Sequence, residues 1–301
     1  MKLRFLSAAL IAGLLLLFAG MGLSQEKISA SEWTEKIGQG TVNWSAGYIE
    51  AVGIGAPPDR TIGKANARPM ALRAAKVDAY RNLLEITKGV RVDSTTSVKD
   101  FTVESDVINT QVDGLVKGGV VVDQQYMSDG TVEVRVRMPL YGNLAQVVIP
   151  ASIEKRKNLK PVEPPPAPEP AVTAPAAPPA PPAPATPPMV YTGLVVDARG
   201  IQARPAMSPR IFDEDGKEVY GSANVDREYA VQQGMSGYAR DLTAAQSNQR
   251  VTNSPITVKG LRTSGTGKAD IVISNADAGQ IRASAENASF MKKCRVMIVL
   301  D

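Results

Sequence analysis

A stretch of proline and alanine from Pro161 to Pro188 constrains this chain more than any other feature. It holds 14 of the 22 prolines in the 301-residue sequence and no aromatic residue. Proline lacks a backbone N–H and fixes φ, so the stretch cannot form a helix interior or a central strand. It also has too few large apolar side chains to form a core. We therefore predict a disordered Pro/Ala-rich linker over residues 151–190, with one folded domain on each side of it.

The N-terminus has the pattern of an export signal. Lys2 and Arg4 precede an uncharged run from Phe5 to Gln25. A short positive region, an apolar stretch and a small-residue exit are typical of a secretory signal peptide. We predict a signal peptide over residues 1–24, cleaved between Ser24 and Gln25, and a periplasmic location. The alternative is an uncleaved leader that holds the protein to the membrane.

Cysteine and histidine usage narrows the chemistry. The only cysteine is Cys294, so the leader has no cysteine for lipid attachment, and an internal disulfide or a multi-cysteine metal site is excluded. We expect Cys294 to be a small core residue. Histidine is absent, which removes the commonest general base and metal ligand. We predict no enzymatic activity, no cofactor and no metal.

The charge balance argues against a nucleic-acid partner. The sequence has 34 basic and 30 acidic residues. Nucleic-acid binding needs clustered basic side chains rather than a small overall excess. We predict protein partners from the envelope, and membrane contact only through an uncleaved leader. The oligomeric state stays open.

For residues 25–150, the pattern predicts an α+β domain. Residues 41–53 and 90–98 are expected to be strands, and residues 118–140 a hairpin that turns at Ser128-Asp129-Gly130. Residues 65–89 are rich in helix formers and end at a glycine. The apolar stripe of this helix is expected to face the sheet and to consist of Ala67, Met70, Ala71, Ala74, Val77 and Leu84.

The helix segment ALRAAKVDAYRNLLE, with a Gly-x-Gly strand before it and a Gly-Gly-Val hairpin after it, carries a resemblance. It resembles the LPP20 lipoprotein family and is similar to the N-terminal domain of the flagellar assembly protein T. The resemblance covers Trp44 to about Leu140. It implies an exported cell-envelope domain of small α/β type without a known active site. The missing lipid-attachment cysteine is a departure from that family.

Asp78 and Arg81 lie three residues apart on the predicted helix and therefore share a face. We expect them to form a structural helix pair. One alternative is a surface ion pair that contributes little. The other is a partly buried pair that fixes how the helix lies on the sheet.

Residues 191–301 are predicted to form a second domain, α/β or α+β. Strands are expected at 192–197, 256–261, 269–274 and 295–300, a hairpin at 210–220, a possible helix at 229–246 and a helix at 276–292. The unit 269–300 has the strand–helix–strand order of a crossover between parallel strands. The overall fold class is thus α+β, with two small domains that each have a mixed or antiparallel sheet and packed helices.

Arg199, Arg204 and Arg210 surround a Gly/Pro loop after the first strand of this domain. Together they form a possible anion-binding site for a phosphate or carboxylate. The alternative is that they are solvated loop arginines balanced by nearby acidic residues. Because polyproline chains are extended, we also expect the linker to act as a spacer between domains whose relative position is not fixed.

Three functions remain open. The leading one is an exported, non-enzymatic cell-envelope protein that acts through protein–protein contacts in the assembly of the envelope or of an appendage, the flagellum being one candidate. The alternative is a periplasmic binding module for an anionic ligand such as a glycan or peptidoglycan fragment. The third is an enzyme that uses carboxylates such as Asp197 and Asp213, although nothing in the sequence brings the two together.

Overall fold

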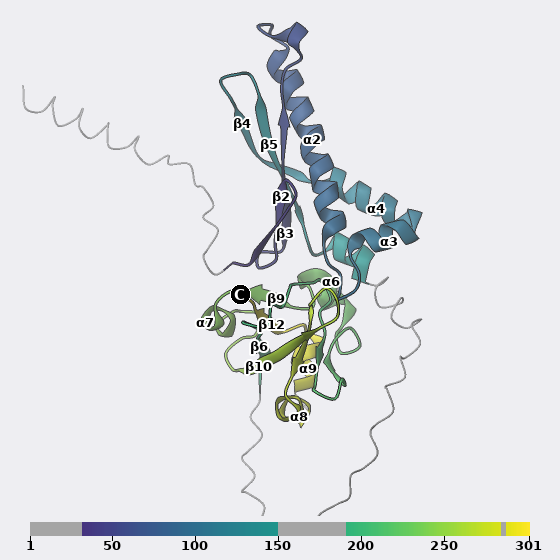
Figure 1. Ribbon diagram of the computed structural model, residues 1–301, viewed down its shortest axis with the longest axis vertical. Helices are drawn as coiled ribbons and strands as arrows, with labels where there is room; N and C mark the ends of the chain where they lie inside the picture. The colour runs from purple at the N-terminus through teal and green to yellow at the C-terminus, as the bar shows by residue number, and fades with distance from the viewer. Residues whose placement is uncertain (1–31, 150–190, 284–286) are drawn as a thin grey trace, which may run out of the picture. The chain divides into compact units, whose positions relative to one another are not determined.

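The computed structural model describes residues 32–149, 191–283 and 287–301. The predicted leader, the cleavage position at Ser24 and Gln25, and the linker lie outside the described residues. The protein is α+β and contains two sheets, one formed before the linker and one after it (Figure 1).

The first sheet is antiparallel throughout, in the order β1-β2-β3-β5-β4. The long helix α2 packs along β3 and β5, and the shorter helices α3 and α4 lie near the C-terminal half of α2 (Figure 1). The elements of this part are β1 (Thr34–Ile37), β2 (Gly40–Asn43), β3 (Tyr48–Gly55), η1 (Asp59–Thr61), α2 (Ala67–Gly89), α3 (Val98–Glu104), α4 (Asp106–Lys117), β4 (Val120–Tyr126) and β5 (Val132–Pro139).

The β4–β5 hairpin confirms the alternation in the sequence. Val132, Val134, Val136 and Met138 of β5 are all buried, as a strand with one core face requires. β4 is an edge strand with a register shift between Val121 and Asp123. Such irregularities protect edges from pairing with other chains.

Helix α2 lies unusually close to β3 because both contribute small residues. Ala71, Ala75 and Ala79 are fully buried on the helix, opposite Gly53 and Gly55 on the strand. A methyl group added at Gly53 would lie 2.0 Å from the backbone nitrogen of Ala79. The glycines are thus required for the helix backbone to approach the strand.

This contact corrects the predicted core stripe of α2. Ala71 is buried as expected, but Ala74 and Val77 are exposed, and the stripe continues instead through Ala75, Ala79, Leu83 and Ile86. The prediction followed hydrophobicity, whereas the close approach selects small side chains. Apolar side chains expected in the core are therefore on the outside of the helix.

Two predicted strands of this part are also wrong. Residues 41–53 divide into β2 and β3, with a turn at Gly47, whose φ is +73°. Residues 90–98 form a tight loop closed by an isolated bridge between Arg91 and Ser97. The carboxylate of Asp93 accepts the backbone N–H groups of Thr95 and Thr96 at 2.8 and 2.9 Å, which favours a turn over a ladder.

The second sheet is mixed, in the order β8-β7-β11-β10-β6-β12-β9. Strands β10, β6, β12 and β9 are parallel neighbours, while β11 is antiparallel to β10. Its elements are β6 (Gly193–Asp197), β7 (Ile211–Phe212), β8 (Glu218–Tyr220), α6 (Arg227–Gln233), β9 (Gly237–Ala239), α7 (Leu242–Gln246), β10 (Pro255–Ser264), β11 (Asp270–Ile273), α8 (Asn275–Ala283), α9 (Asn287–Lys292) and β12 (Val296–Val299).

The hairpin at 210–220 and the four predicted strands are confirmed, but two other predictions are not. β11 and β12 are separated by β10 and β6 and run in opposite directions, so no parallel crossover joins them. Residues 229–246 are not one helix, because Gly234 has φ +79° and ends α6 before β9 begins. Cys294 is a buried core residue, as expected, and burial raises the pKa of its thiol to about 11.

The two sheets are in contact with each other. From the proline-rich linker we had expected two domains whose relative position is not fixed. Buried apolar side chains of both sheets form one continuous cluster, and Trp44 meets Tyr238 edge to face at 5.8 Å. Ser94 is fully buried in the loop after α2, and its Oγ accepts the backbone N–H groups of Ala269 and Asp270. The two sheets therefore make direct contacts, whereas the independent folding of the two predicted domains stays a prediction.

We predict that Gly53→Ala destabilises the protein by roughly 3 kcal/mol, because the added methyl group displaces helix backbone rather than a movable side chain. Gly114→Ala is the matched control, since Gly114 lies in α4 with no atom within 4 Å of the added methyl group. It should stabilise by about 0.5–1 kcal/mol through helix propensity. Urea unfolding of both variants measures this, and equal effects would contradict the packing argument.

Candidate functional site

The carboxylate of Asp78 does not pair with Arg81. Its Oδ2 accepts the backbone N–H of Ile54 at 3.0 Å, and the side chain of Asn82 donates to the carbonyl of Val52 at 2.8 Å. β2 begins at Gly40, opposite Ala51, so this side of β3 has no strand partner for these groups. The helix supplies the missing partners instead. Asp78 thus fixes α2 on the sheet, but through the strand backbone rather than through Arg81.

An apolar groove runs along the exposed side of α2, with a volume of about 580 Å³; we call it the α2 groove. It contains side chains that we had predicted to lie in the core, including Val77, which is 55% exposed. The apolar side chains lining it are Ala56, Pro58, Pro69, Met70, Ala74 and Val77.

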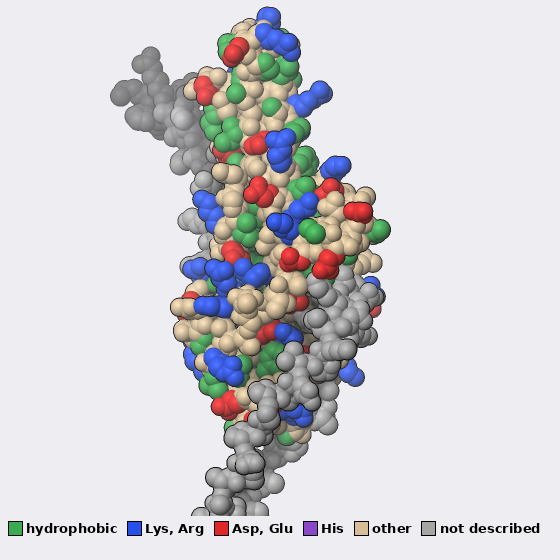
Figure 2. Space-filling view, turned by 45° about the vertical axis from the view of Figure 1, so that its right-hand side comes forward, with side chains coloured by type: hydrophobic (Ala, Val, Ile, Leu, Met, Phe, Trp, Pro, Cys, Tyr) green, Lys and Arg blue, Asp and Glu red, His purple; other side chains and the backbone are tan. Residues whose placement is uncertain are grey.

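The α2 groove is surrounded by positive charge. Between residues 59 and 81 only Asp59 and Asp78 are acidic, and Asp78 is bonded to the strand. Within the described residues no ion pair forms to the basic side chains of this segment. Figure 2 shows blue and green side chains intermixed over the upper end of α2. The basic residues are Arg60, Lys64, Arg68, Arg73, Lys76 and Arg81.

The three arginines of the predicted anion site have different environments. Arg199 makes a two-point contact with Asp197, at 2.8 and 2.9 Å. Arg210 donates to Asp270, whose side chain is 2% exposed. Arg204 is exposed. An anion would have to compete with a carboxylate at Arg199 and at Arg210, so the geometry gives this hypothesis no preformed site.

Asp197 and Asp213, the carboxylates of the enzyme hypothesis, have separate cationic partners. Asp197 contacts Arg199 and also Lys259 at 3.4 Å, whereas Asp213 contacts Arg282 at 2.8 Å. The hydrogen bond from Arg199 lowers the pKa of Asp197 to about 2, which keeps it ionised. Each of the two carboxylates thus belongs to its own ion pair.

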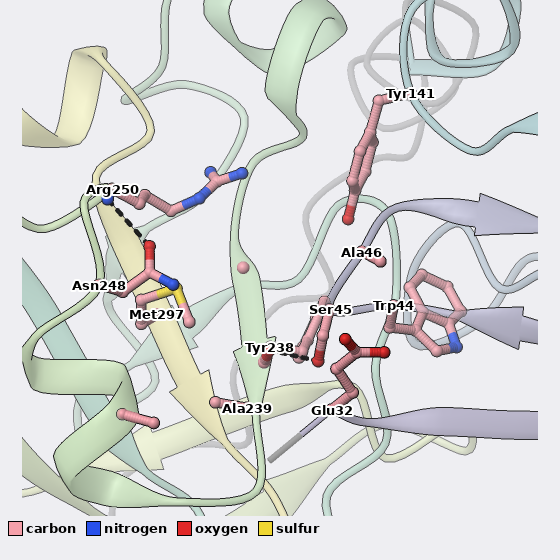
Figure 3. A pocket seen from close by; sticks show the side chains of 12 residues that line it. Glu32, Trp44, Ser45, Ala46, Tyr141, Tyr238, Ala239, Asn248, Arg250 and Met297 are labelled. Atoms are coloured by element: carbon pink, nitrogen blue, oxygen red, sulfur yellow. Dashed lines mark hydrogen bonds between the residues drawn. The ribbon is translucent and has the colours of Figure 1, made fainter. Parts of the chain in front are cut away.

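A polar pocket of about 390 Å³ lies between the two sheets; we call it the inter-sheet pocket (Figure 3). The segment from Glu32 to Ala46 and Tyr141 form one wall, and residues 237–250 with Met297 of β12 form the other. Ser45 links the walls, because its hydroxyl donates to the carbonyl of Tyr238 at 2.7 Å.

Tyr141 and Arg250 both contribute polar groups to the inter-sheet pocket. Figure 3 shows the Tyr141 hydroxyl pointing into the pocket, and this buried oxygen has no hydrogen-bond partner among the described residues. Burial raises the pKa of Tyr141, and the positive charge of Arg250 opposes that rise. Arg250 donates to the carbonyls of Gln233, Gly234 and Cys294, all backbone acceptors.

Two further features bear on the class of site. Across residues 32–149, 191–283 and 287–301, no three or more acidic or cysteine side chains are grouped so as to hold a metal ion. In the same part of the chain, no helix has both the length and the hydropathy needed to cross a bilayer.

Comparison with known families gives a match to the C-terminal part of the chain. Residues 193–301 are similar to the family model described as Treponema pallidum Tp0624, second domain. The similarity covers β6 to β12 and includes Arg250 and Met297 of the inter-sheet pocket. No curated protein matches the chain. The LPP20 and flagellar assembly protein T resemblance of the N-terminal part stays a prediction.

Sequence reasoning missed both the α2 groove and the inter-sheet pocket. The groove had a usable signal, since the helix offers two apolar stripes and only the alanine stripe fits against Gly53 and Gly55. The pocket had none, because its residues come from Glu32 to Met297 and only the tertiary fold brings them together.

The bonding of Asp78 predicts unequal effects of two substitutions on α2. Asp78→Ala removes the acceptor for Ile54 and should lower the free energy of unfolding by about 1 kcal/mol. Arg81→Ala, three residues away on the exposed surface, should change it by less than about 0.5 kcal/mol. Urea unfolding measures both, and equal losses would support the ion pair with Arg81 instead.

The pairing of Asp197 predicts a pH-dependent contribution to stability. Its folded pKa of about 2 lies below the unfolded value, so the stabilisation is present above about pH 4 and is lost as the pH falls towards 2. Asp197→Asn should cost about 1 kcal/mol at pH 7, because its cationic partners are partly exposed and solvent screens them. Unfolding of both proteins from pH 7 to pH 2 tests this. A difference that stays constant with pH would contradict it.

Proposed function

We propose that this protein is an exported, non-enzymatic component of the bacterial cell envelope that works in envelope or appendage assembly by binding other proteins. The observation that carries the proposal is the α2 groove. There, Met70, Ala74 and Val77 form an apolar surface that the fold does not use for its own core. Exposed apolar surfaces of this kind, rimmed by charge, are typical of protein contact sites.

The chemistry of the groove indicates its partner. An apolar floor with Arg73 and Arg81 on its rim suits a segment whose apolar side chains are flanked by Asp or Glu. Arg73 and Arg81 have no carboxylate partner in the part of the chain that the structure describes, so they remain available for such charges. The partner class is thus an acidic amphipathic segment of another envelope protein.

Export is supported by the sequence of residues 1–24, and the non-enzymatic role by the missing histidines and by the separate partners of Asp197 and Asp213. The periplasm is the location that such a leader predicts. A flagellar setting rests on the resemblance of the N-terminal part alone.

A photo-crosslinking residue placed at Val77 in cells tests the proposal. It should trap a protein at a segment rich in acidic residues, and Arg73→Glu with Arg81→Glu should reduce the adduct at least about tenfold, since rim charges govern encounter. The control places the photo-crosslinking residue at Leu261, an exposed apolar position in the second sheet. It should give no adduct with the acidic segment of the partner.

Two results would overturn the proposal. One is the absence of any adduct at Val77 above the level at Leu261. The other is salt-sensitive sedimentation with phosphatidylglycerol vesicles that the double charge reversal abolishes, because the basic groove would then be a membrane surface.

A further inference from the structure

The inter-sheet pocket contains a buried polar group that the fold leaves unsatisfied. The Tyr141 ring lies between Gly47 and Gly234, where an added methyl group would come within 2.9 and 2.4 Å of its ring atoms. The ring is therefore held in place, and its hydroxyl has no partner among the described residues. Leaving a buried hydroxyl unpaired is costly, so such a group indicates a missing hydrogen-bond partner.

Positive charge lies beside this hydroxyl. Arg250 uses its terminal nitrogens on three backbone carbonyls, and no described carboxylate pairs with it. Asn248 accepts the backbone N–H of Arg250 with its oxygen at 2.9 Å, and Figure 3 draws its amide nitrogen towards the pocket. This side of the pocket therefore offers two neutral donors next to an uncompensated guanidinium, which is suited to a carboxylate.

The other side of the pocket has the opposite charge. Figure 3 draws Glu32 across the pocket from Arg250, and one oxygen of its carboxylate accepts the side-chain amide of Asn43 at 2.7 Å. A carboxylate held in this way can receive an ammonium group. The volume of about 390 Å³ is at the small end of ligand pockets.

We infer that the inter-sheet pocket binds a small zwitterion, a free amino acid or a dipeptide. The ligand carboxylate would accept from Tyr141 and Asn248 beside Arg250, and its ammonium group would contact Glu32. This site is independent of the α2 groove and of the proposed envelope role. Because its walls come from both sheets, the ligand would also strengthen the contact between them.

Titration of the full chain with alanylalanine tests the inference, with tryptophan fluorescence as the signal because Trp44 lines the pocket. We expect saturable binding. Converting the C-terminal carboxylate of the dipeptide to an amide should weaken binding at least about tenfold. N-acetylation should weaken it to the same extent, because it removes the ammonium group that contacts Glu32. The inference would be overturned if the fluorescence showed no saturable change up to about 10 mM alanylalanine, since even very weak binding would be detected at that concentration.

Variants separate a ligand role from a structural one. Tyr141→Phe keeps the ring but removes the unpaired hydroxyl, so it should weaken alanylalanine binding at least about tenfold without lowering the melting temperature of the ligand-free protein. Glu32→Gln should weaken alanylalanine binding but leave that of the N-acetyl form unchanged. Tyr191→Phe is the control and should bind as the wild type does, because the Tyr191 hydroxyl accepts from Gln280 and neither residue lines the pocket.

A lower melting temperature for ligand-free Tyr141→Phe, with unchanged alanylalanine binding, would mean that water alone satisfies the hydroxyl and would overturn the inference. Equal weakening of every form of the dipeptide by Glu32→Gln would contradict the ammonium contact, and with it the assignment of a zwitterion.

Discussion

The close approach of α2 to β3 is the constraint on which the first half of the structure depends. Two glycines on the strand and three alanines on the helix remove the side chains that would hold the backbones apart. At that distance the side chains of Asp78 and Asn82 reach strand backbone groups that no neighbouring strand satisfies. The same contact turns Met70 and Val77 away from the core, so the packing of small residues also creates the α2 groove.

A second set of contacts joins the two sheets through hydrogen bonds between serine side chains and backbone groups. Ser94 is buried against the turn and start of β11, and Gly265 and Gly267 leave room for it, since a methyl group at either would come within 2.8 Å of Ser94 atoms. With Ser45 bonded to Tyr238, the sheets meet at two separate places. The inter-sheet pocket lies at the second of these, so its shape depends on both halves of the chain.

How much the sequence could predict follows from the range of the interactions involved. The β4–β5 hairpin was predictable because alternation and an Asp-Gly turn are local signals. The core face of α2 was not predicted, because it is chosen by Gly53 and Gly55 on another element. The direction of β11 relative to β12 was wrong for a similar reason: the two strands are separated by β10 and β6, and no local pattern records that insertion. The pocket residues share no segment, so no spacing rule could find them.

The arginines show why residue type and spacing alone are weak evidence for a site. Arg199 and Arg210 are close to one another in sequence, yet each is neutralised by its own carboxylate, Asp197 or Asp270. The sequence around Arg250 carries no recognisable motif. Among the described residues its guanidinium has only backbone carbonyl partners, at the end of α6 and after α9. Helix C-termini favour a cation and hold it in place, but they do not cancel its charge as a carboxylate does. A fixed cation that keeps its charge beside an unpaired hydroxyl is therefore the arrangement that distinguishes a ligand site from a structural ion pair in this fold.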